Sequence, residues 1–332
     1  MPSPTLFFET MGAFQRTAAL RAAIELDVFT AIADGHTTAV SLGTHCGASE
    51  RGMRILCDFL TVIGFLRKKG NEYALTEDSD VYLNRNSPVC VAAAAEFSGS
   101  KMQRENYENL SGTIRRGGVT LTELGNTEAE HPVWVKYAQG MAPVAALTAP
   151  AIARQLGAES GAPMKLLDVA AGHGMFGIAI AQQNPNAQIV ALDWAPVLEV
   201  AKGNAAKAGV SERYETIAGS AFDAELGEGY DLVLITNFLH HFDPATCEVF
   251  LRRVHQALKP GGRAATLEFV PNDDRVSPAP DAMFSLVMLA STPAGDAYTF
   301  SELDRMFANA GFSWSEVHRL KERSSALVIS IK

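Results

Sequence analysis

The chain has 332 residues, of which 47% are hydrophobic and 20% are charged, a balance typical of a globular protein that buries a substantial core. Its formal net charge of -9 disfavours nucleic acid and anionic lipid as partners, because both are themselves negatively charged. The four cysteines stand apart, without a C-x-x-C pair or the spacing of metal ligands, so we expect neither a disulfide framework nor a metal site.

The first ten residues, MPSPTLFFET, lack the basic segment and the apolar core of a secretory signal. No stretch of the chain approaches the roughly twenty apolar residues that span a bilayer. We therefore expect a cytoplasmic protein with no membrane partner, in which the cysteines are reduced.

Helices are predicted at the start of the chain. Apolar residues recur at helical spacing from Thr10 to about Ile32, and Gly35 stands where a glycine commonly ends a helix. A second helix is expected to begin after Thr38.

The clearest amphipathic pattern lies between Ser49 and Phe65, with Ser49 as the N-cap and apolar side chains recurring on one face. The next stretch, FLRKKGNEYALT, predicts two short strands around a turn at residues 69–71. Three helices followed by a hairpin predict a mostly helical winged-helix domain over residues 1–85.

A winged helix makes DNA binding the first functional hypothesis. Acidic residues outnumber basic ones through residue 80, however, and the helix that would enter the groove carries Phe59, Leu60, Val62 and Ile63 where Arg, Asn or Gln would read bases. An apolar face wider than one core requires favours a buried protein interface. We interpret residues 1–85 as a dimerisation domain that forms a homodimer, with no nucleic acid partner.

Residues 86–160 are predicted to be mainly helical. Ser87-Pro88 marks a break, after which the segments 90–97 and 101–114 have helical patterns. Residues 115–132 form a polar connector, and the pattern from Trp134 to Leu156 is helical again, with interruptions at Pro143 and Pro150.

From Met164 onward, short apolar strands alternate with amphipathic helices. The predicted strands are KLLDVAA, AQIVALD, RYETIAGS, YDLVLITN and RAATLEFV. This alternation predicts an α/β domain over residues 161–332, a doubly wound parallel sheet with helices on both faces. In such sheets the ligand lies outside the carboxyl ends of the strands, where the strand order reverses.

A glycine turn follows the first of these strands, with the spacing Gly172-x-Gly174-x-x-Gly177. The absence of Gly-Lys-Ser/Thr argues against a nucleoside triphosphate. Both a nicotinamide dinucleotide and S-adenosylmethionine suit the turn. In either cofactor the ribose hydroxyls can hydrogen-bond to an acid at the end of the next strand, here Asp193. Asp168 favours the sulfonium compound, because an acid there would repel a pyrophosphate but not a cation.

The ordered series LLDVAAGHG, IVALDWA, AGSAF, YDLVLITNFLHHF, CEVFLRRVHQALKPGGR and TLEFV resembles the motifs of class I S-adenosylmethionine-dependent methyltransferases. Over nearly its full length the chain resembles the small-molecule O-methyltransferases with an N-terminal winged-helix dimerisation domain, the group of the caffeate, acetylserotonin and hydroxyneurosporene methyltransferases. The resemblance implies a Rossmann-like methyltransferase sheet, a connector over residues 86–160 that contributes to the substrate pocket, and a small-molecule substrate.

The resemblance also implies a set of cofactor contacts for S-adenosylmethionine. Asp168 and the backbone near Gly172 and Gly174 would contact its methionyl end, and Asp193 would bind the ribose. The other implied cofactor residues, most of them flanking the adenine, are Trp194, Ser220, Ala221, Phe222 and Asn237.

Methyl transfer to oxygen requires an aligned acceptor and removal of its proton, a task that suits a histidine with a pKa of about 6.5. In the family the catalytic histidine lies seven positions before a cysteine, and counting back from Cys247 gives His240. His241 takes the place of the usual acid, and the sequence leaves open whether it shares or replaces the role of His240. Glu268 matches a glutamate that flanks the histidine and would hold its tautomer.

Several positions depart from the family pattern. The second flanking glutamate is missing, since Ala297 takes its place and Asp296 stands one position away. Ala170 and Ala171 replace consecutive glycines in the turn, and Ser220 replaces the usual acid near the adenine. These changes affect the support for base catalysis more than the many contacts of the cofactor.

The segment DAMFSLVMLAST matches the helix that lines the acceptor pocket in the family. It implies that Met283, Phe284, Met288 and Leu289 form apolar walls, with Met141 joining them. No charged cluster marks a coenzyme A, sugar phosphate or nucleic acid acceptor.

The sequence therefore predicts an O-methyltransferase that acts on a hydroxyl of a small aromatic or polyketide-like molecule. The missing acids leave open N- or C-methylation, or another reaction of the same cofactor. A winged-helix DNA-binding regulator and a nicotinamide-dependent enzyme are the remaining alternatives.

Overall fold

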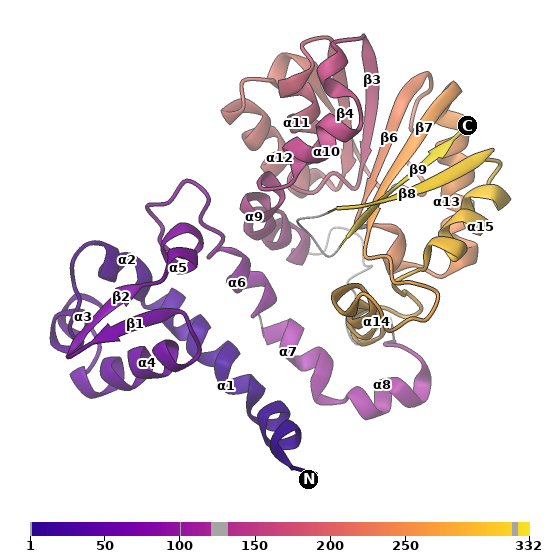
Figure 1. The fold of residues 1–332 in the computed structure, drawn as a ribbon. Helices are drawn as coiled ribbons and strands as arrows, with labels where there is room; N and C mark the ends of the chain where they lie inside the picture. Colours follow the sequence, from indigo (N-terminus) through magenta and orange to yellow (C-terminus); the bar gives the residue numbers. More distant parts are fainter. Residues whose placement is uncertain (1, 100, 121–131, 321–324) are drawn as a thin grey trace. The chain divides into compact units, whose positions relative to one another are not determined.

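A computed structural model describes residues 2–99, 101–120, 132–320 and 325–332. The chain divides into two compact units, Met1–Lys101 and Met102–Lys332 (Figure 1). The predicted helical connector, residues 86–160, is split between them, and the polar stretch predicted at 115–132 lies largely outside the described residues.

The first unit contains the predicted helices and hairpin. Its elements are α1 (Thr5–Glu25), α2 (Val28–Ala33), α3 (Ala39–His45), α4 (Glu50–Val62), β1 (Leu66–Lys69), β2 (Glu72–Leu75), α5 (Glu77–Tyr82) and α6 (Ala94–Ser98). Strands β1 and β2 pair in antiparallel fashion, with Lys69 opposite Glu72. A core built on Phe29, Leu42 and Met53 lies between the helices and this hairpin.

The single helix predicted from Thr10 to Ile32 is wrong, because the chain forms two helices there. Asp27 adopts a left-handed backbone with φ 58°, which interrupts the helical path between α1 and α2. The predicted helix start after Thr38 and the predicted N-cap at Ser49 are both confirmed. The side chain of Thr38 accepts a hydrogen bond from Ser41 N, and that of Ser49 accepts one from Gly52 N.

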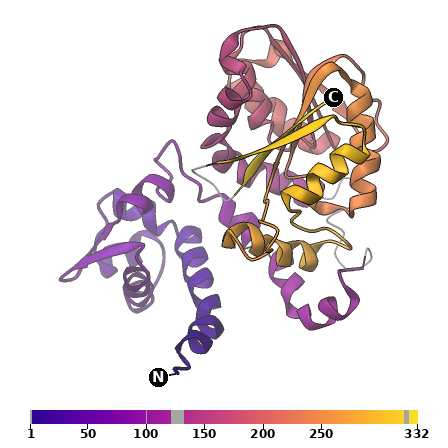
Figure 2. The same cartoon turned by 45° about the vertical axis from the view of Figure 1, so that its right-hand side comes forward.

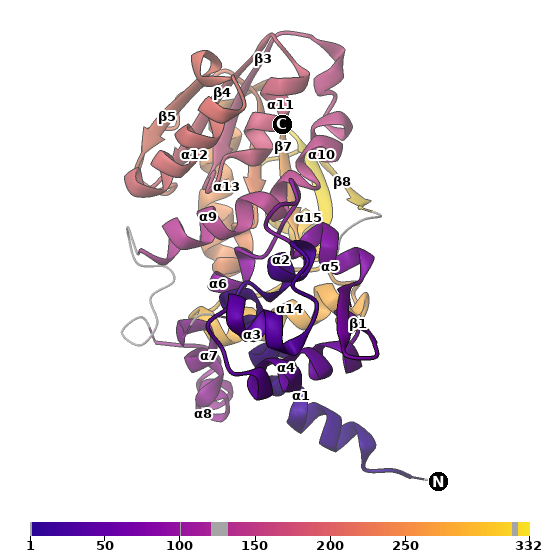
Figure 3. The ribbon, with the colours of Figure 1, turned by 90° about the vertical axis from the view of Figure 1, so that its left-hand side faces the viewer.

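Helix α1 carries large apolar side chains that nothing in its own unit covers. Leu6, Phe7, Phe8, Met11 and Phe14 are 60% to 76% exposed. They occupy the first turns of the helix, nearest the N-terminus (Figure 3). So large an exposed apolar surface is typical of a protein interface.

The second unit opens with helices that precede its sheet: α7 (Lys101–Glu108), α8 (Leu110–Arg116), α9 (Val133–Ala146), α10 (Ala149–Gln155) and the short η1 (Ala158–Ser160). The predicted interruption at Pro143 is wrong, since α9 runs through this residue. Proline has no backbone N–H, so the helix lacks the hydrogen bond that another residue would donate there. The break falls at Leu147 and Thr148 instead, and Pro150 occupies the first turn of α10, where proline fits.

A seven-stranded sheet forms the centre of this unit. Its elements, in chain order, are β3 (Met164–Val169), α11 (Met175–Gln183), β4 (Ala187–Asp193), α12 (Ala195–Lys207), η2 (Ser211–Arg213), β5 (Tyr214–Ala218), β6 (Tyr230–Thr236), η3 (Leu239–His241), α13 (Pro244–Ala257), β7 (Leu258–Glu268), α14 (Ala279–Ser291), α15 (Phe300–Asn309), β8 (Trp314–Arg319) and β9 (Ala326–Ile331). The strand order is β5-β4-β3-β6-β7-β9-β8, with β5 and β8 at opposite edges (Figure 3).

The five predicted strands are parallel, which confirms the α/β class with a Rossmann-like sheet. Strand β9 runs antiparallel to both β7 and β8, and neither β8 nor β9 was predicted from the sequence. Helices α10, α11 and α12 pack on one face of the sheet, and α13 and α15 on the other (Figure 2). The two apolar cores hold the strands rigidly, so that side chains at their carboxyl ends are fixed in position.

Candidate active site

The strand order reverses between β3 and β6, next to the carboxyl ends of β4 and β7. Each of these four strands ends at one of the predicted site residues or just before one. The glycine turn follows β3, Asp193 ends β4, His240 follows β6, and Glu268 ends β7. The sequence therefore placed the ligand site at the edge of the sheet where these segments meet.

The glycine turn bends sharply between β3 and α11. Ala170, Gly172 and Gly174 all have positive φ angles, of 50°, 57° and 73°. A Cβ on Gly174 would overlap the hydroxyl of Tyr214, so this position requires glycine for space as well as for its backbone. Ala170 adopts the left-handed conformation despite its Cβ, at a cost of roughly 1–2 kcal/mol.

Asp168 lies beneath this turn and is only 1% exposed. Its Oδ2 accepts a hydrogen bond from Gly177 N at 3.3 Å, which ties β3 to the start of α11. Its Oδ1 is buried and finds no partner within the described part of the chain. Burial, together with the neighbouring charge of Asp193, raises the pKa of Asp168 to about 8.

Asp193 joins the end of β4 to the glycine turn. Its two carboxylate oxygens accept hydrogen bonds from Gly172 N and from Trp194 N, both at 2.7 Å. Burial raises its pKa to about 6. Each carboxylate oxygen can accept a second hydrogen bond, so Asp193 keeps the capacity to bind ribose hydroxyls.

The other predicted cofactor residues lie on the same edge of the sheet. Ser220 Oγ accepts from Phe222 N at 3.1 Å, and Ala221 is buried. The ring of Phe222 packs against those of Phe238, Phe242 and Phe250, as a core residue would. Trp194 is half-buried at the start of α12, and Asn237 turns the chain after β6 with φ 52°. That these residues flank an adenine stays a prediction.

The residues around the turn fit a cationic ligand better than a pyrophosphate. The buried carboxyl group of Asp168 and the half-buried one of Asp193 underlie it, and residues 168–177 contain no lysine or arginine. The uncompensated Asp168 Oδ1 would be stabilised by a nearby positive charge. No group of three metal-ligating side chains occurs among the residues that the structure describes.

His240 and Glu268, which lie 28 residues apart in the sequence, are in direct contact. Both are buried, at 4% and 3% exposed, and His240 Nδ1 lies 2.5 Å from Glu268 Oε2. Glu268 Oε1 accepts two further hydrogen bonds at 2.9 Å, from the backbone N–H groups of Phe238 and Leu239. One carboxylate thus fixes both the imidazole and the turn that carries it.

This contact determines the tautomer of His240. An ionised carboxylate only accepts hydrogen bonds, so Nδ1 carries the proton and Nε2 carries the lone pair. No hydrogen bond to Nε2 is made by the described residues. The site therefore holds an oriented imidazole whose basic nitrogen is available for a proton.

Among the described residues, the second acid of the family pattern has no counterpart beside His240. Ala297 is fully buried at the predicted position. Asp296 is engaged elsewhere, because its Oδ2 lies 3.1 Å from Arg275 Nη1. Gly295 packs directly on the backbone of the histidine turn, and a Cβ there would overlap the carbonyl oxygen of His240.

Aromatic rings surround the two histidines. The ring of Phe284, a predicted wall residue on α14, contacts His240 edge-on at 4.9 Å between centroids and stacks on Phe269 at 3.9 Å. Trp134 on α9 approaches His241 at 5.5 Å. Phe269 and Trp134 were not predicted from the sequence, although an aromatic residue at a strand end and the aromatic VWVKY segment could have indicated them.

The remaining predicted wall residues differ in exposure. Met288 is buried, Met141 and Leu289 are half-buried, and Met283 is 71% exposed and does not face the packed interior of its own unit. A role for these four in binding the acceptor stays a prediction.

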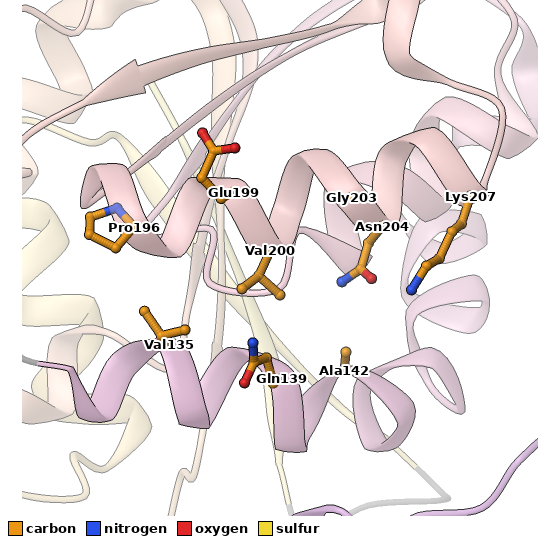
Figure 4. Close-up of a pocket in the computed structure, with 9 residues that line it drawn as sticks. All are labelled: Val135, Gln139, Ala142, Pro196, Glu199, Val200, Gly203, Asn204 and Lys207. Carbon is orange, nitrogen blue, oxygen red and sulfur yellow. The ribbon is translucent and has the colours of Figure 1, made fainter.

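A separate cavity of about 530 Å³ lies between α9 and α12 (Figure 4). Val135, Gln139 and Ala142 face it from α9, and Val200, Asn204 and Lys207 face it from α12. Asn204 also donates to the carbonyl of His173 in the glycine turn, at 2.9 Å. None of the predicted site residues lines this cavity.

No helix among the described residues is long and apolar enough to cross a membrane.

Comparison with known proteins identifies the two parts of the chain. A family model described as an O-methyltransferase domain matches residues 106–313, and one described as an O-methyltransferase dimerisation domain matches residues 8–85. The 3-hydroxy-5-methyl-1-naphthoate 3-O-methyltransferase of Streptomyces sahachiroi is 27% identical over 321 residues, covering 93% of this chain and 90% of that protein.

Two solved structures share the fold over nearly the whole length. A protein from Nostoc punctiforme superimposes with a TM-score of 0.95 at 50% identity, and all of both chains is covered. Human N-acetylserotonin methyltransferase, solved in complex with S-adenosylmethionine, superimposes with a TM-score of 0.87 at 22% identity, with 99% of this chain and 97% of that chain covered.

Proposed function

The chain belongs to the O-methyltransferase family, and on that premise we propose that it transfers a methyl group from S-adenosylmethionine to a hydroxyl of a small aromatic or polyketide-like molecule, with His240 as the general base. The observation that carries the proposal is the buried pair of His240 and Glu268 beside the glycine turn. Membership of the family also decides against the nicotinamide alternative.

The bound cofactor supplies a methyl group on a positively charged sulfur, ready for in-line displacement. The acceptor hydroxyl, with a pKa of about 10 in a simple phenol, must lose its proton to His240 Nε2. Glu268 holds the imidazole in the tautomer that can accept this proton and stabilises the imidazolium that results. Phe284 and Phe269 offer flat apolar surface for an aromatic acceptor.

We assign distinct cofactor roles to the two carboxyl groups at the glycine turn. Asp193 presents spare acceptor capacity for the ribose hydroxyls. Asp168, whose Oδ1 has no hydrogen-bond partner among the described residues, would serve the methionyl end together with the backbone of Gly172 and Gly174. Trp194, Phe222 and Asn237 complete the adenosine side.

The proposal is tested by incubating the protein with S-adenosylmethionine and a panel of phenols and polyketide-like hydroxy compounds. Methylated product is expected from at least one acceptor, with a loss of about 10²–10⁴-fold in kcat for His240→Ala. Unchanged turnover in that variant would show that another group is the base.

Methylation of nitrogen or carbon is the second candidate, and it is motivated by Ala297, which stands where the family has a second acid. Mass spectrometry detects the added methyl group, and the carbon-13 NMR shift of that group distinguishes an O-methyl from an N- or C-methyl product.

We further propose that the first unit forms a homodimer through the exposed apolar side chains of α1. Light scattering of the intact protein is expected to give a dimer, and Phe8→Glu to shift it toward monomer. A gel shift with duplex DNA is expected to show no complex, because the unit is acidic.

A further inference from the structure

His241 stands beside the proposed base, yet the proposed mechanism gives it no task. Its ring lies 4.4 Å from that of His240 between centroids, with the planes tilted by 57°. On its other side it meets Trp134 of α9, whereas His240 meets Phe284 of α14. The two imidazoles therefore occupy neighbouring places between the two helices that border the candidate acceptor region.

The partners of the two rings differ in a way that sets opposite tautomers. His240 donates from Nδ1 to Glu268, which leaves the lone pair on Nε2. His241 Nδ1 is buried and has no hydrogen-bond partner among the described residues. A buried N–H without an acceptor is rarer in proteins than a buried lone pair without a donor, so the proton of His241 belongs on Nε2.

His241 also remains uncharged. Burial and the adjacent His240 lower the pKa of His241 well below its usual range. Unlike the acid that usually occupies this place in the family, a neutral imidazole with its proton on Nε2 cannot accept a hydrogen bond there. It offers one N–H donor, and the described residues provide no acceptor for it.

We propose that His241 is a specificity-determining residue whose Nε2–H donates a hydrogen bond to an oxygen that the substrate carries next to the hydroxyl deprotonated by His240. This inference rests on the proposed function and refines it. A carbonyl, ether or quinone oxygen on the neighbouring ring carbon, or at the peri position of a fused ring, has the required lone pair and proximity. The preferred substrate class is thus an aromatic hydroxyl flanked by an oxygen acceptor.

The inference is tested first by the preference between positional isomers. Wild-type protein is offered pairs of phenols with an acceptor oxygen adjacent to the hydroxyl or remote from it, such as 2-methoxyphenol and 4-methoxyphenol and their naphthol counterparts. The adjacent isomer is expected to have a five- to tenfold higher kcat/KM, the size of one hydrogen bond to a neutral partner.

His241→Leu removes the donor and is expected to bring this ratio close to one, whereas His241→Gln, which restores an amide N–H, retains part of it. His255→Leu is the matched control, because His255 packs on Phe312 away from the site and its loss leaves the ratio as in wild type. An equal ratio in wild type, or an unchanged ratio in His241→Leu, overturns the inference while the methyltransferase function stands.

A measurement without any acceptor keeps the two hypotheses separate. Nitrogen-15 NMR of histidine-labelled protein is expected to show the proton on Nδ1 of His240 and on Nε2 of His241, with variants at each position providing the assignment. A proton on Nδ1 of His241 overturns the inference whatever the activity is. Absence of methyl transfer to every acceptor, with the expected tautomers present, counts against the proposed function instead.

Discussion

Replacing Glu268 by glutamine tests how the site fixes its base. The carboxylate accepts three hydrogen bonds, two through Oε1 from backbone N–H groups and one through Oε2 from His240 Nδ1. A glutamine has one acceptor oxygen and one donor NH₂ group. If its oxygen keeps the two backbone donors, its NH₂ group faces His240 and requires a lone pair on Nδ1.

The opposite orientation would leave the two buried N–H groups of Phe238 and Leu239 without an acceptor, at a cost of about 1–3 kcal/mol each. The first orientation is therefore the stable one. It moves the proton of His240 to Nε2, where the imidazole can no longer accept a proton from the acceptor hydroxyl. The expected loss in kcat is that of a general base, about 10²–10⁴-fold.

Steady-state methyl transfer by mass spectrometry, with thermal unfolding in parallel, checks this expectation. Glu268→Gln is expected to fold with a modest decrease in stability. Glu268→Ala leaves the N–H groups of Phe238 and Leu239 without an acceptor and is expected to lose about 2–6 kcal/mol of unfolding free energy. His240→Ala combined with Glu268→Gln is expected to be no slower than His240→Ala alone, since the two residues act as a unit. A Glu268→Gln enzyme with wild-type kcat would refute the tautomer argument.

Three further changes test the parts that position the site. Gly295→Ala introduces a Cβ that overlaps the carbonyl oxygen of His240, so kcat is expected to fall by tenfold or more while the affinity for S-adenosylhomocysteine, measured by calorimetry, is retained. Gly174→Ala is expected to weaken that affinity through its clash with the Tyr214 hydroxyl, and Tyr214→Phe in the same chain to restore part of it. Folding raises the pKa of Asp168 from 3.8 to about 8, so between these pH values only the folded state keeps the proton, and the unfolding free energy of the wild-type protein falls as the pH rises. Asp168→Asn is expected to make this fall, measured by urea titrations at several pH values, less steep.

The chain offers a control for the two glycine substitutions. A Cβ on Gly203, in the middle of α12, meets no atom within 4 Å, and its backbone is helical. Gly203→Ala is expected to leave kcat and cofactor affinity in place and to stabilise the protein by about 1 kcal/mol. Equal effects of Gly203→Ala and Gly295→Ala on kcat would remove the case for specific contact with His240, and wild-type affinity in Gly174→Ala would do the same for the glycine turn. A pH profile of Asp168→Asn that matches wild type would show that Asp168 does not titrate in this window.

The sequence predicted those features that depend on local order along the chain. Most of the five parallel strands carry apolar runs, and the helix start after Thr38 and the cap at Ser49 depend on neighbouring residues, so these features could be inferred from spacing alone. The pairing of His240 with Glu268 was implied by family resemblance, and the structure shows why it forms: the ends of β6 and β7 are adjacent.

Other features depend on contacts between distant segments and could not be inferred in this way. The break at Asp27 requires a left-handed residue that helical periodicity does not reveal. Strand β9 obtains its antiparallel direction from pairing with β7, and β8 pairs in turn with β9, so neither direction follows from the composition of the strand itself. The stacking of Phe269 on Phe284 joins a strand end to a later helix, so neither residue alone indicates an aromatic wall.

The buried acids at the glycine turn connect stability to the choice of cofactor. Asp168 and Asp193 both have raised pKa values, so their ionised forms are disfavoured where they lie. The turn adds backbone strain at Ala170, and Asp168 Oδ1 has no hydrogen-bond partner in the described ranges of the chain. A cation bound above the turn would favour ionisation of both acids and offset these costs, whereas a pyrophosphate would increase them. The raised pKa values of the two acids and the strained backbone of Ala170 lower the stability of the protein without ligand. These features are expected of a site that binds a sulfonium compound, because functional sites commonly sacrifice stability.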